Sequence, residues 1–134
     1  MLASSAEIGQ GVQSVLGQIA AHELGIDPAR VIVTAPDTGV TPFDQRTNAS
    51  RATSLLGHAV QEAAQRVAEQ VRAIAAEALD VSPDACRLEG GGVTAGGRTL
   101  TLGEVIQRFF RDAGGELIGH GYQRPATGLN VLGA

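Results

Sequence analysis

Residues 48–79 read NASRATSLLGHAVQEAAQRVAEQVRAIAAEAL, and this stretch decides the fold. Apolar side chains recur every three or four positions along it, from Ala52 and Leu55 to Ala78 and Leu79. This spacing places them on one face of an α-helix. At ~1.5 Å per residue the helix would be roughly 45–50 Å long, too long for a compact small domain. We therefore expect its apolar stripe to be incompletely covered by this chain, and the isolated chain to self-associate.

A βαβ-like unit precedes the long helix. Residues 2–8 are expected to form a short strand, and residues 12–24 have the apolar spacing of a helix that Gly25 would cap. The β-branched run inside residues 30–35 is typical of a buried strand. The sequence leaves open whether the two strands pair in parallel. If they do, the loops that follow them emerge at the same edge.

The second half of the chain predicts a small β-hairpin and a short helix. Residues 86–89 and 98–100 flank a glycine-rich stretch, residues 90–97, which is interpreted as the turn of the hairpin. Thr101 and Glu104 have the spacing of a capping box at the start of a helix. Beyond that helix, residues 116–122 alternate weakly, as a strand would.

The predicted fold class is α+β, a mixed α/β arrangement in which the βαβ-like unit and the long helix are followed by the hairpin and short helix. We treat residues 1–134 as a single segment with three parts. Residues 1–80 hold the loops and the long helix, residues 81–122 hold the hairpin and short helix, and residues 123–134 form a tail.

Composition excludes several classes of function. The net charge of −4 and the scattered arginines argue against a nucleic-acid partner. One cysteine, Cys86, excludes a disulfide within the chain, and no apolar run is long enough to predict a membrane span. With no signal-peptide pattern, the expected location is the cytoplasm.

Two loops that end at predicted helix starts are the candidate binding features. The first holds Gly9, Gln10 and Gly11, and the second ends in residues 47–51, with sequence TNASR. Backbone N–H groups, hydroxyls and an arginine at a helix start favour an anionic ligand. The plain alternatives are a tight strand-to-helix turn and an ordinary N-cap. The first loop lacks the third glycine of a dinucleotide-binding fingerprint, because position 14 is Ser14.

Together the two loops resemble a known family. The motifs are EIGQG at 7–11, QIAA at 18–21, LGI at 24–26, DT at 37–38, TP at 41–42, Asp44, and Thr47 followed by ASR at 49–51. In this order and spacing they resemble the large, molybdenum-binding subunit of the xanthine dehydrogenase/aldehyde oxidase family. The resemblance is dense over residues 5–64 and looser over residues 97–105 and 115–117.

The resemblance implies that this chain cradles part of a molybdopterin cofactor, expected in its cytosine dinucleotide form. Gly9, Gln10 and Gly11 would contact the pterin side, and Thr47, Ser50 and Arg51 would lie along the phosphates. The complete enzyme would hydroxylate an aldehyde or heteroaromatic C–H with water-derived oxygen. Its implied partners are the remaining domains of the large subunit and the iron–sulfur and flavin subunits or domains.

The chain holds no candidate catalytic residue or metal ligand. Glu116 follows two glycines, as the catalytic glutamate does in that family, but its surroundings match the region upstream of that glutamate. It is therefore interpreted as structural. His22, His58 and His120 lack the spacing of metal ligands. We expect an inactive fragment without bound cofactor. The alternatives are a non-catalytic nucleotide- or phosphate-binding module and a helical assembly domain.

Overall fold

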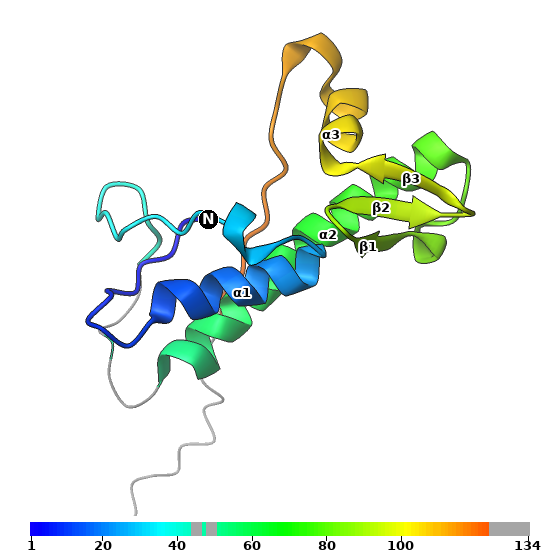
Figure 1. Ribbon diagram of the computed structural model, residues 1–134. Coiled ribbons are helices and arrows are strands. Elements are labelled where there is room, and N and C mark those ends of the chain that lie inside the picture. Colours follow the sequence, from blue (N-terminus) through cyan, green and yellow to red (C-terminus); the bar gives the residue numbers. More distant parts are fainter. Residues whose placement is uncertain (44–46, 48–50, 124–134) are drawn as a thin grey trace, which may run out of the picture.

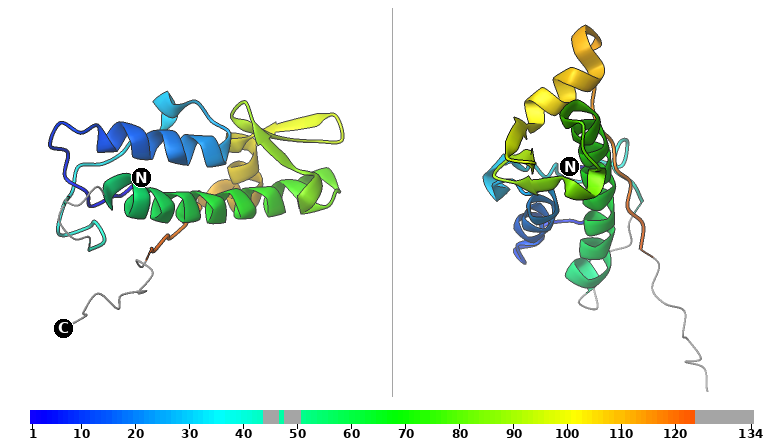
Figure 2. Two further views of the ribbon diagram at one scale, coloured as in Figure 1. Left: turned by 90° about the horizontal axis from the view of Figure 1, so that it is seen from below. Right: turned by 90° about the vertical axis from the view of Figure 1, so that its right-hand side faces the viewer.

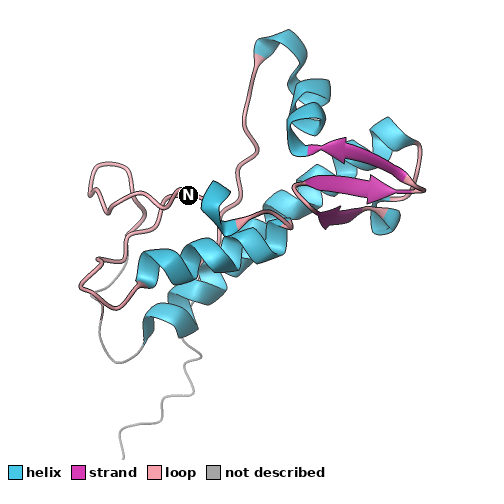
Figure 3. Ribbon diagram, viewed as in Figure 1, coloured by secondary structure: helices cyan, strands magenta, loops and turns pink. Residues whose placement is uncertain are grey.

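The computed structural model describes residues 1–43, 47 and 51–123. Two helices, α1 (Val12–Leu24) and α2 (Gly57–Leu79), lie side by side, and a small sheet and a third helix cover the far end of α2 (Figures 1, 2 and 3). The α+β class predicted from the sequence is confirmed.

Helix α1 has the bounds that its apolar spacing predicts. Leu16 and Ala20 are buried against α2, in a cluster that includes Val60 and Ala64 of that helix. Gly25 closes the helix as predicted, and its N–H reaches the carbonyls of the last turn. Its own carbonyl accepts a hydrogen bond from Gly91 at 2.9 Å, so the end of α1 is tied to the sheet.

Helix α2 ends at Leu79, where the sequence predicts the end of the long helix. Within the described residues the helical run is seen from Arg51 onward, and the stretch Ala52–Leu56 has π-type hydrogen bonding. The predicted start at residues 48–50 lies outside the described residues. The first half of α2 packs on α1, and the second half packs on the sheet and the third helix. One helix therefore serves two separate apolar cores.

The predicted hairpin is in fact a three-stranded antiparallel sheet, in the order β1 (Arg87–Glu89), β2 (Gly92–Ala95) and β3 (Arg98–Thr101). The glycine-rich stretch was wrongly interpreted as a single turn. Glycine pairs at 90–91 and 96–97, all with positive φ, make two tight turns, and the residues between them form the central strand. Val93 of that strand is fully buried between Leu88 and Leu100.

Helix α3 (Leu102–Phe110) starts with the predicted capping box. The Glu104 N–H donates to the Thr101 hydroxyl at 3.2 Å, and the Glu104 carboxylate accepts from the Thr101 N–H at 2.8 Å. These bonds lower the pKa of Glu104, mainly through the Thr101 N–H. Val105 is fully buried and fixes α3 on the core.

The two predicted strands of the βαβ-like unit are only extended segments. They are joined where the Met1 N-terminus donates to the Ile32 carbonyl at 2.7 Å and the Thr34 N–H donates to the Met1 carbonyl at 3.1 Å. This is the bonding pattern of parallel strands. One such pair is too short to count as a sheet, and Leu2 and Ile32 stay largely exposed.

The predicted strand at residues 116–122 pairs with no strand in the part of the chain that the structure describes. It runs extended along α2, in the opposite direction to the helix (Figure 2). The Gln70 side chain donates to the Ile118 carbonyl at 2.9 Å, and the Tyr122 N–H donates to the Glu62 carboxylate at 2.9 Å. We call residues 116–122 the strap.

The strap changes the expectation that the apolar stripe of the long helix is incompletely covered. The strap, α1 and the sheet cover α2 on different sides. Among the described residues, the large exposed apolar side chains all lie outside α2: Leu2, Ile8, Ile32, Val40, Phe43, Phe109, Ile118 and Tyr122. None of the described helices is long and apolar enough to cross a membrane.

The close packing of the strap on α2 predicts that position 121 must be a glycine. A Cβ on Gly121 would overlap the Ala59 carbonyl of α2. Gly121→Ala should therefore lower the free energy of unfolding by about 1–3 kcal/mol in chemical denaturation. Gly103→Ala is the matched control, because its Cβ would meet nothing closer than 3.9 Å. Equal stability of both variants would show that the strap does not pack closely on α2.

Candidate functional site

The described residues of both predicted binding loops lie at one end of the molecule, near the start of α1 and the first described turn of the long helical run (Figure 1). The Ser5 hydroxyl lies 3.1 Å from the Thr47 hydroxyl, although 42 positions separate the two residues. Ser5 is buried, so this contact fixes the second loop beside the segment that leads into the first. The parallel pairing of Met1 with residues 32–34 directs both chain segments to this end.

The first loop is closed by its own glutamate. One carboxylate oxygen of Glu7 accepts from the N–H groups of Gly9 and Gly11, both at 2.9 Å. The other oxygen accepts from the Gln13 N–H at 3.3 Å. These are the amides that the sequence offered as free anion donors. In the structure they point at Glu7 instead of into a cleft shared with the second loop.

Gln10 is folded back onto the same loop. Its amide nitrogen donates to the Ala6 carbonyl at 2.9 Å, and its amide oxygen accepts from the Ile8 N–H at 2.6 Å. The outer side of the loop is open, because a Cβ at Gly9 or Gly11 would meet nothing within 4 Å. The backbone of the loop is therefore exposed on its outer side and held by hydrogen bonds within the loop. A flat, polar group can approach it from that side.

The connection between the extended segment and residue 43 is an equally self-contained turn. The Asp37 carboxylate accepts from the Gly39 N–H at 2.8 Å, and the Thr41 hydroxyl donates to the Asp37 carbonyl at 2.6 Å. Phe43 follows this turn with 89% of its surface exposed. Asp44 of the sequence motif lies outside the described residues.

The three predicted phosphate-side residues are placed unequally. Thr47 is half-buried and contacts Ser5, Ser50 lies outside the described residues, and Arg51 is half-buried at the first helical position that the structure describes. The turn that follows Arg51 contains no acidic residue. Of these three residues, the structure therefore describes one hydroxyl, which contacts Ser5, and one guanidinium.

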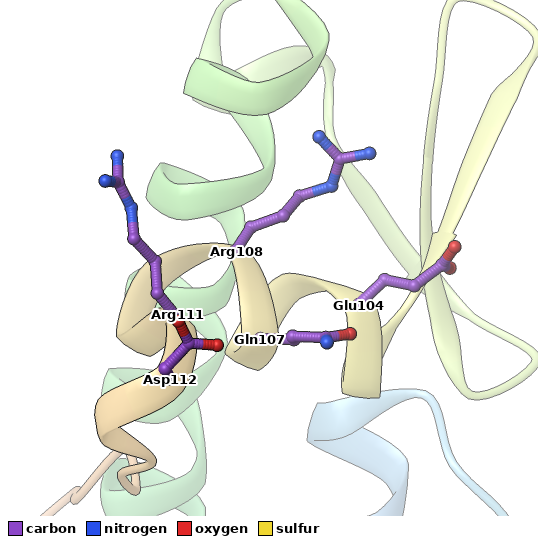
Figure 4. Close-up of a pocket in the computed structure, with 5 residues that line it drawn as sticks. All are labelled: Glu104, Gln107, Arg108, Arg111 and Asp112. Carbon is purple, nitrogen blue, oxygen red and sulfur yellow. The ribbon is translucent and has the colours of Figure 1, made fainter.

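A surface pocket of about 400 Å³ lies elsewhere, on α3. Its lining residues, which Figure 4 shows, are Glu104, Gln107, Arg108, Arg111 and Asp112. The two arginine side chains point away from each other in that view. Charges of both signs without a common focus give no reason to place the cofactor there, and the sequence resemblance does not point to these residues.

The structure gives no catalytic or metal-binding role to the other reactive side chains that it describes. Within the described part of the chain, no group of His, Cys, Asp and Glu side chains could hold a metal ion. Cys86 is buried, and burial raises the pKa of its thiol, which leaves it unreactive. Glu116 is exposed in the strap.

The site residues that sequence reasoning missed are Ser5 and Glu7. Glu7 was noted only as part of the EIGQG motif. An acidic residue just before a glycine turn that leads into a helix is the signal that could have identified it, because its carboxylate can reach the first helical N–H groups. Nothing local marks Ser5, since its partner is distant in the sequence.

This arrangement has counterparts among known proteins. A model of the molybdopterin cofactor-binding domain matches residues 1–130. The chain belongs to this family of domains, which form part of molybdenum hydroxylase-type oxidoreductases.

Two bacterial relatives illustrate the similarity. The chain is 39% identical over 84 residues to the gamma subunit of the 6-hydroxypseudooxynicotine dehydrogenase complex of Paenarthrobacter nicotinovorans, a match covering 63% of this chain and 11% of the relative. It is 39% identical over 74 residues to the carbon monoxide dehydrogenase large chain of Hydrogenophaga pseudoflava, covering 55% and 9%. The matched stretch is thus about a tenth of each relative's length.

Solved structures share the fold. Quinoline 2-oxidoreductase from Pseudomonas putida 86 superposes with a TM-score of 0.77 at 27% identity, covering 91% of this chain and 17% of that chain. The carbon monoxide dehydrogenase of Oligotropha carboxidovorans superposes with a TM-score of 0.75 at 24% identity, covering 91% and 16%.

The Glu7 contacts predict a pH dependence. The Gly11 N–H, followed by those of Gln13 and Gly9, holds the pKa of Glu7 below its ordinary value against the opposing effect of desolvation. These bonds therefore stabilise the loop above the ordinary glutamate pKa, and the stabilisation is lost as pH falls through the lowered one. The Gly9 and Gly11 amide shifts in NMR should report that low midpoint. Glu7→Gln should abolish the transition, and its persistence would assign it to another group.

Proposed function

We propose that this chain is the part of a molybdenum hydroxylase large subunit that positions the pterin and phosphate portions of the molybdopterin cofactor. The observation that carries the proposal is the Ser5–Thr47 contact. It holds together, at one end of the molecule, the two loops that the family motifs mark. The matched family model supports the identity of the ligand.

The two loops divide the work according to their chemistry. Gly9, Gln10 and Gly11 form an uncharged edge whose own polar groups are largely engaged, which suits the flat, polar pterin. Thr47, Ser50 and Arg51 supply hydroxyls and a cation at a helix start, which suits the phosphates. The cytosine dinucleotide form would extend the phosphate-bearing end of the ligand.

When bound, the molybdenum–pterin group supplies the redox chemistry. In the complete enzyme we propose the hydroxylation of an aldehyde or heteroaromatic C–H with oxygen derived from water, with electrons passing to iron–sulfur and flavin subunits or domains. The residues of this chain bind and orient the cofactor. The relatives named as dehydrogenases are much longer than this chain, which agrees with a role in holding the cofactor as one part of a larger catalytic unit.

The phosphate assignment is tested with Arg51. In the complete subunit, Arg51→Ala should weaken cofactor retention by about 1.5–3 kcal/mol, because a charge-assisted contact is lost. The pterin content of the purified protein measures the effect. Arg66→Ala is the matched control, since Arg66 lies on the same helix and pairs with Glu62 on the surface. Unchanged cofactor content in the Arg51 variant would contradict the phosphate assignment and leave Arg51 as part of an ordinary helix start.

The 134-residue chain alone should carry no molybdenum and show no oxidoreductase activity. The sequence offers part of a cofactor cradle but no residue matched to the family's catalytic glutamate. Metal analysis and a dye-reduction assay on the purified chain check this expectation. Near-stoichiometric molybdenum would contradict it.

A further inference from the structure

We propose that the extended segment at residues 31–35, with sequence VIVTA, pairs edge to edge with the same segment of a second copy of this chain. The contact would join the short parallel pairs of the two copies into one larger sheet. It gives the expected self-association of the chain a surface other than α2, whose apolar stripe is covered by α1, the sheet and the strap. The inference is independent of the cofactor site.

One edge of this segment is paired and the other is open. The Ile32 carbonyl and the Thr34 N–H both bond to Met1. Neighbouring residues of an extended strand direct their backbone groups to opposite edges, so those of Val33 point away from Met1. Among the described residues, no group forms a hydrogen bond with the Val33 N–H or carbonyl. The structure thus leaves a donor and an acceptor side by side, in the arrangement that another strand would bind.

The sequence of this edge contains nothing that discourages pairing. Residues 31–35 include no charged residue, proline or glycine, and four of the five are β-branched. The outer strands of the three-stranded sheet differ, because they carry the exposed side chains of Arg87, Glu89 and Arg98. Charged side chains on an edge strand guard it against association. The edge at Val33 has no such guard.

Both faces of the segment have room for a second strand. Ile32, on the outer face, is 76% exposed. On the inner face, Val31 and Val33 line a surface hollow of about 340 Å³ together with Gly17 of α1. A second copy would place its own Val33 beside this hollow and its Thr34 beside Ile32. Apolar surface would therefore be covered on both faces.

The charges at the two ends of the segment favour a second copy in the antiparallel direction. Arg30 precedes the segment and Asp37 follows it, and both are exposed. An antiparallel pair centred on Val33 brings Arg30 of each copy towards Asp37 of the other, whereas a parallel pair brings like charges together. The two Val33 residues would exchange N–H···O=C bonds, and the Ala35 N–H of each copy would donate to the Val31 carbonyl of the other. The segment is thus its own complement, as a two-fold dimer requires.

Sedimentation equilibrium of the 134-residue chain over a range of concentrations tests the proposal. The wild type should pass from monomer to dimer as the concentration rises, with no larger species. Ile32→Lys should raise the dissociation constant of the dimer about tenfold, because the new charge enters the contact twice. Ile118→Lys is the matched control, since Ile118 is an isoleucine with 55% exposure that lies in the strap. It should dimerise as the wild type does.

Amide hydrogen exchange locates the contact. The Val33 N–H should exchange freely in dilute solution and become protected as the dimer forms. The Thr34 N–H points to the other edge and is already bonded to Met1, so its protection should change little with concentration.

Several results would overturn the inference. They are a monomer at every concentration, larger assemblies, a dimer that Ile32→Lys leaves intact, or an equal loss of dimer in Ile118→Lys. Protection of the Val33 N–H in dilute solution would also overturn it, because the partner would then lie within the chain. If Ile32→Lys does not fold, the exchange of the wild-type Val33 N–H decides alone. No cofactor takes part, so failure of the proposed function would leave these results unchanged.

Discussion

The structure depends on the contact between α2 and its neighbours through small side chains. Ala64, Ala68, Ala75 and Ala76 are buried along the helix, and they let α1 on one side and the sheet on the other approach its backbone closely. The aromatic content of the chain is only 3%, so this close packing replaces the large rings that fill most cores. A helix that serves two cores in this way fixes the distance between the sheet at one end and the loops at the other.

The elements that the sequence predicts well are those whose signals are local. The spacing of apolar residues in α1, the cap at Gly25, the end of α2 at Leu79 and the capping box at Thr101 all depend on neighbours within a few positions. The central strand β2 was missed because glycines on both sides of it masked a short alternation. The strap was misinterpreted for a different reason. Its partner is a helix more than 40 positions away, and only the overlap that a Cβ would cause at Gly119 and Gly121 reveals the fit.

The same division applies to the candidate site. Its two loops could be found from the sequence, because glycines, hydroxyls and an arginine before helices form a recognisable pattern. That the loops lie together could not be found, because it depends on the Ser5–Thr47 contact and on the pairing of Met1 with residues 32–34. The direction in which each N–H group points could not be predicted from the sequence either. It depends on which side chain, here that of Glu7, is already bound there.

A loop that contains its own anion need not be an anion site, although its glycines and its place before a helix suggest one. Backbone N–H groups at a helix start favour negative charge, and here the carboxylate of Glu7, two residues before Gly9, accepts from them. Binding the Glu7 carboxylate costs little chain entropy, because the bonds of Gln10 to Ala6 and Ile8 already order the loop. A glycine pattern before a helix therefore does not by itself identify the ligand of the loop. In this chain the group that the amides of Gly9 and Gly11 bind is the carboxylate of Glu7.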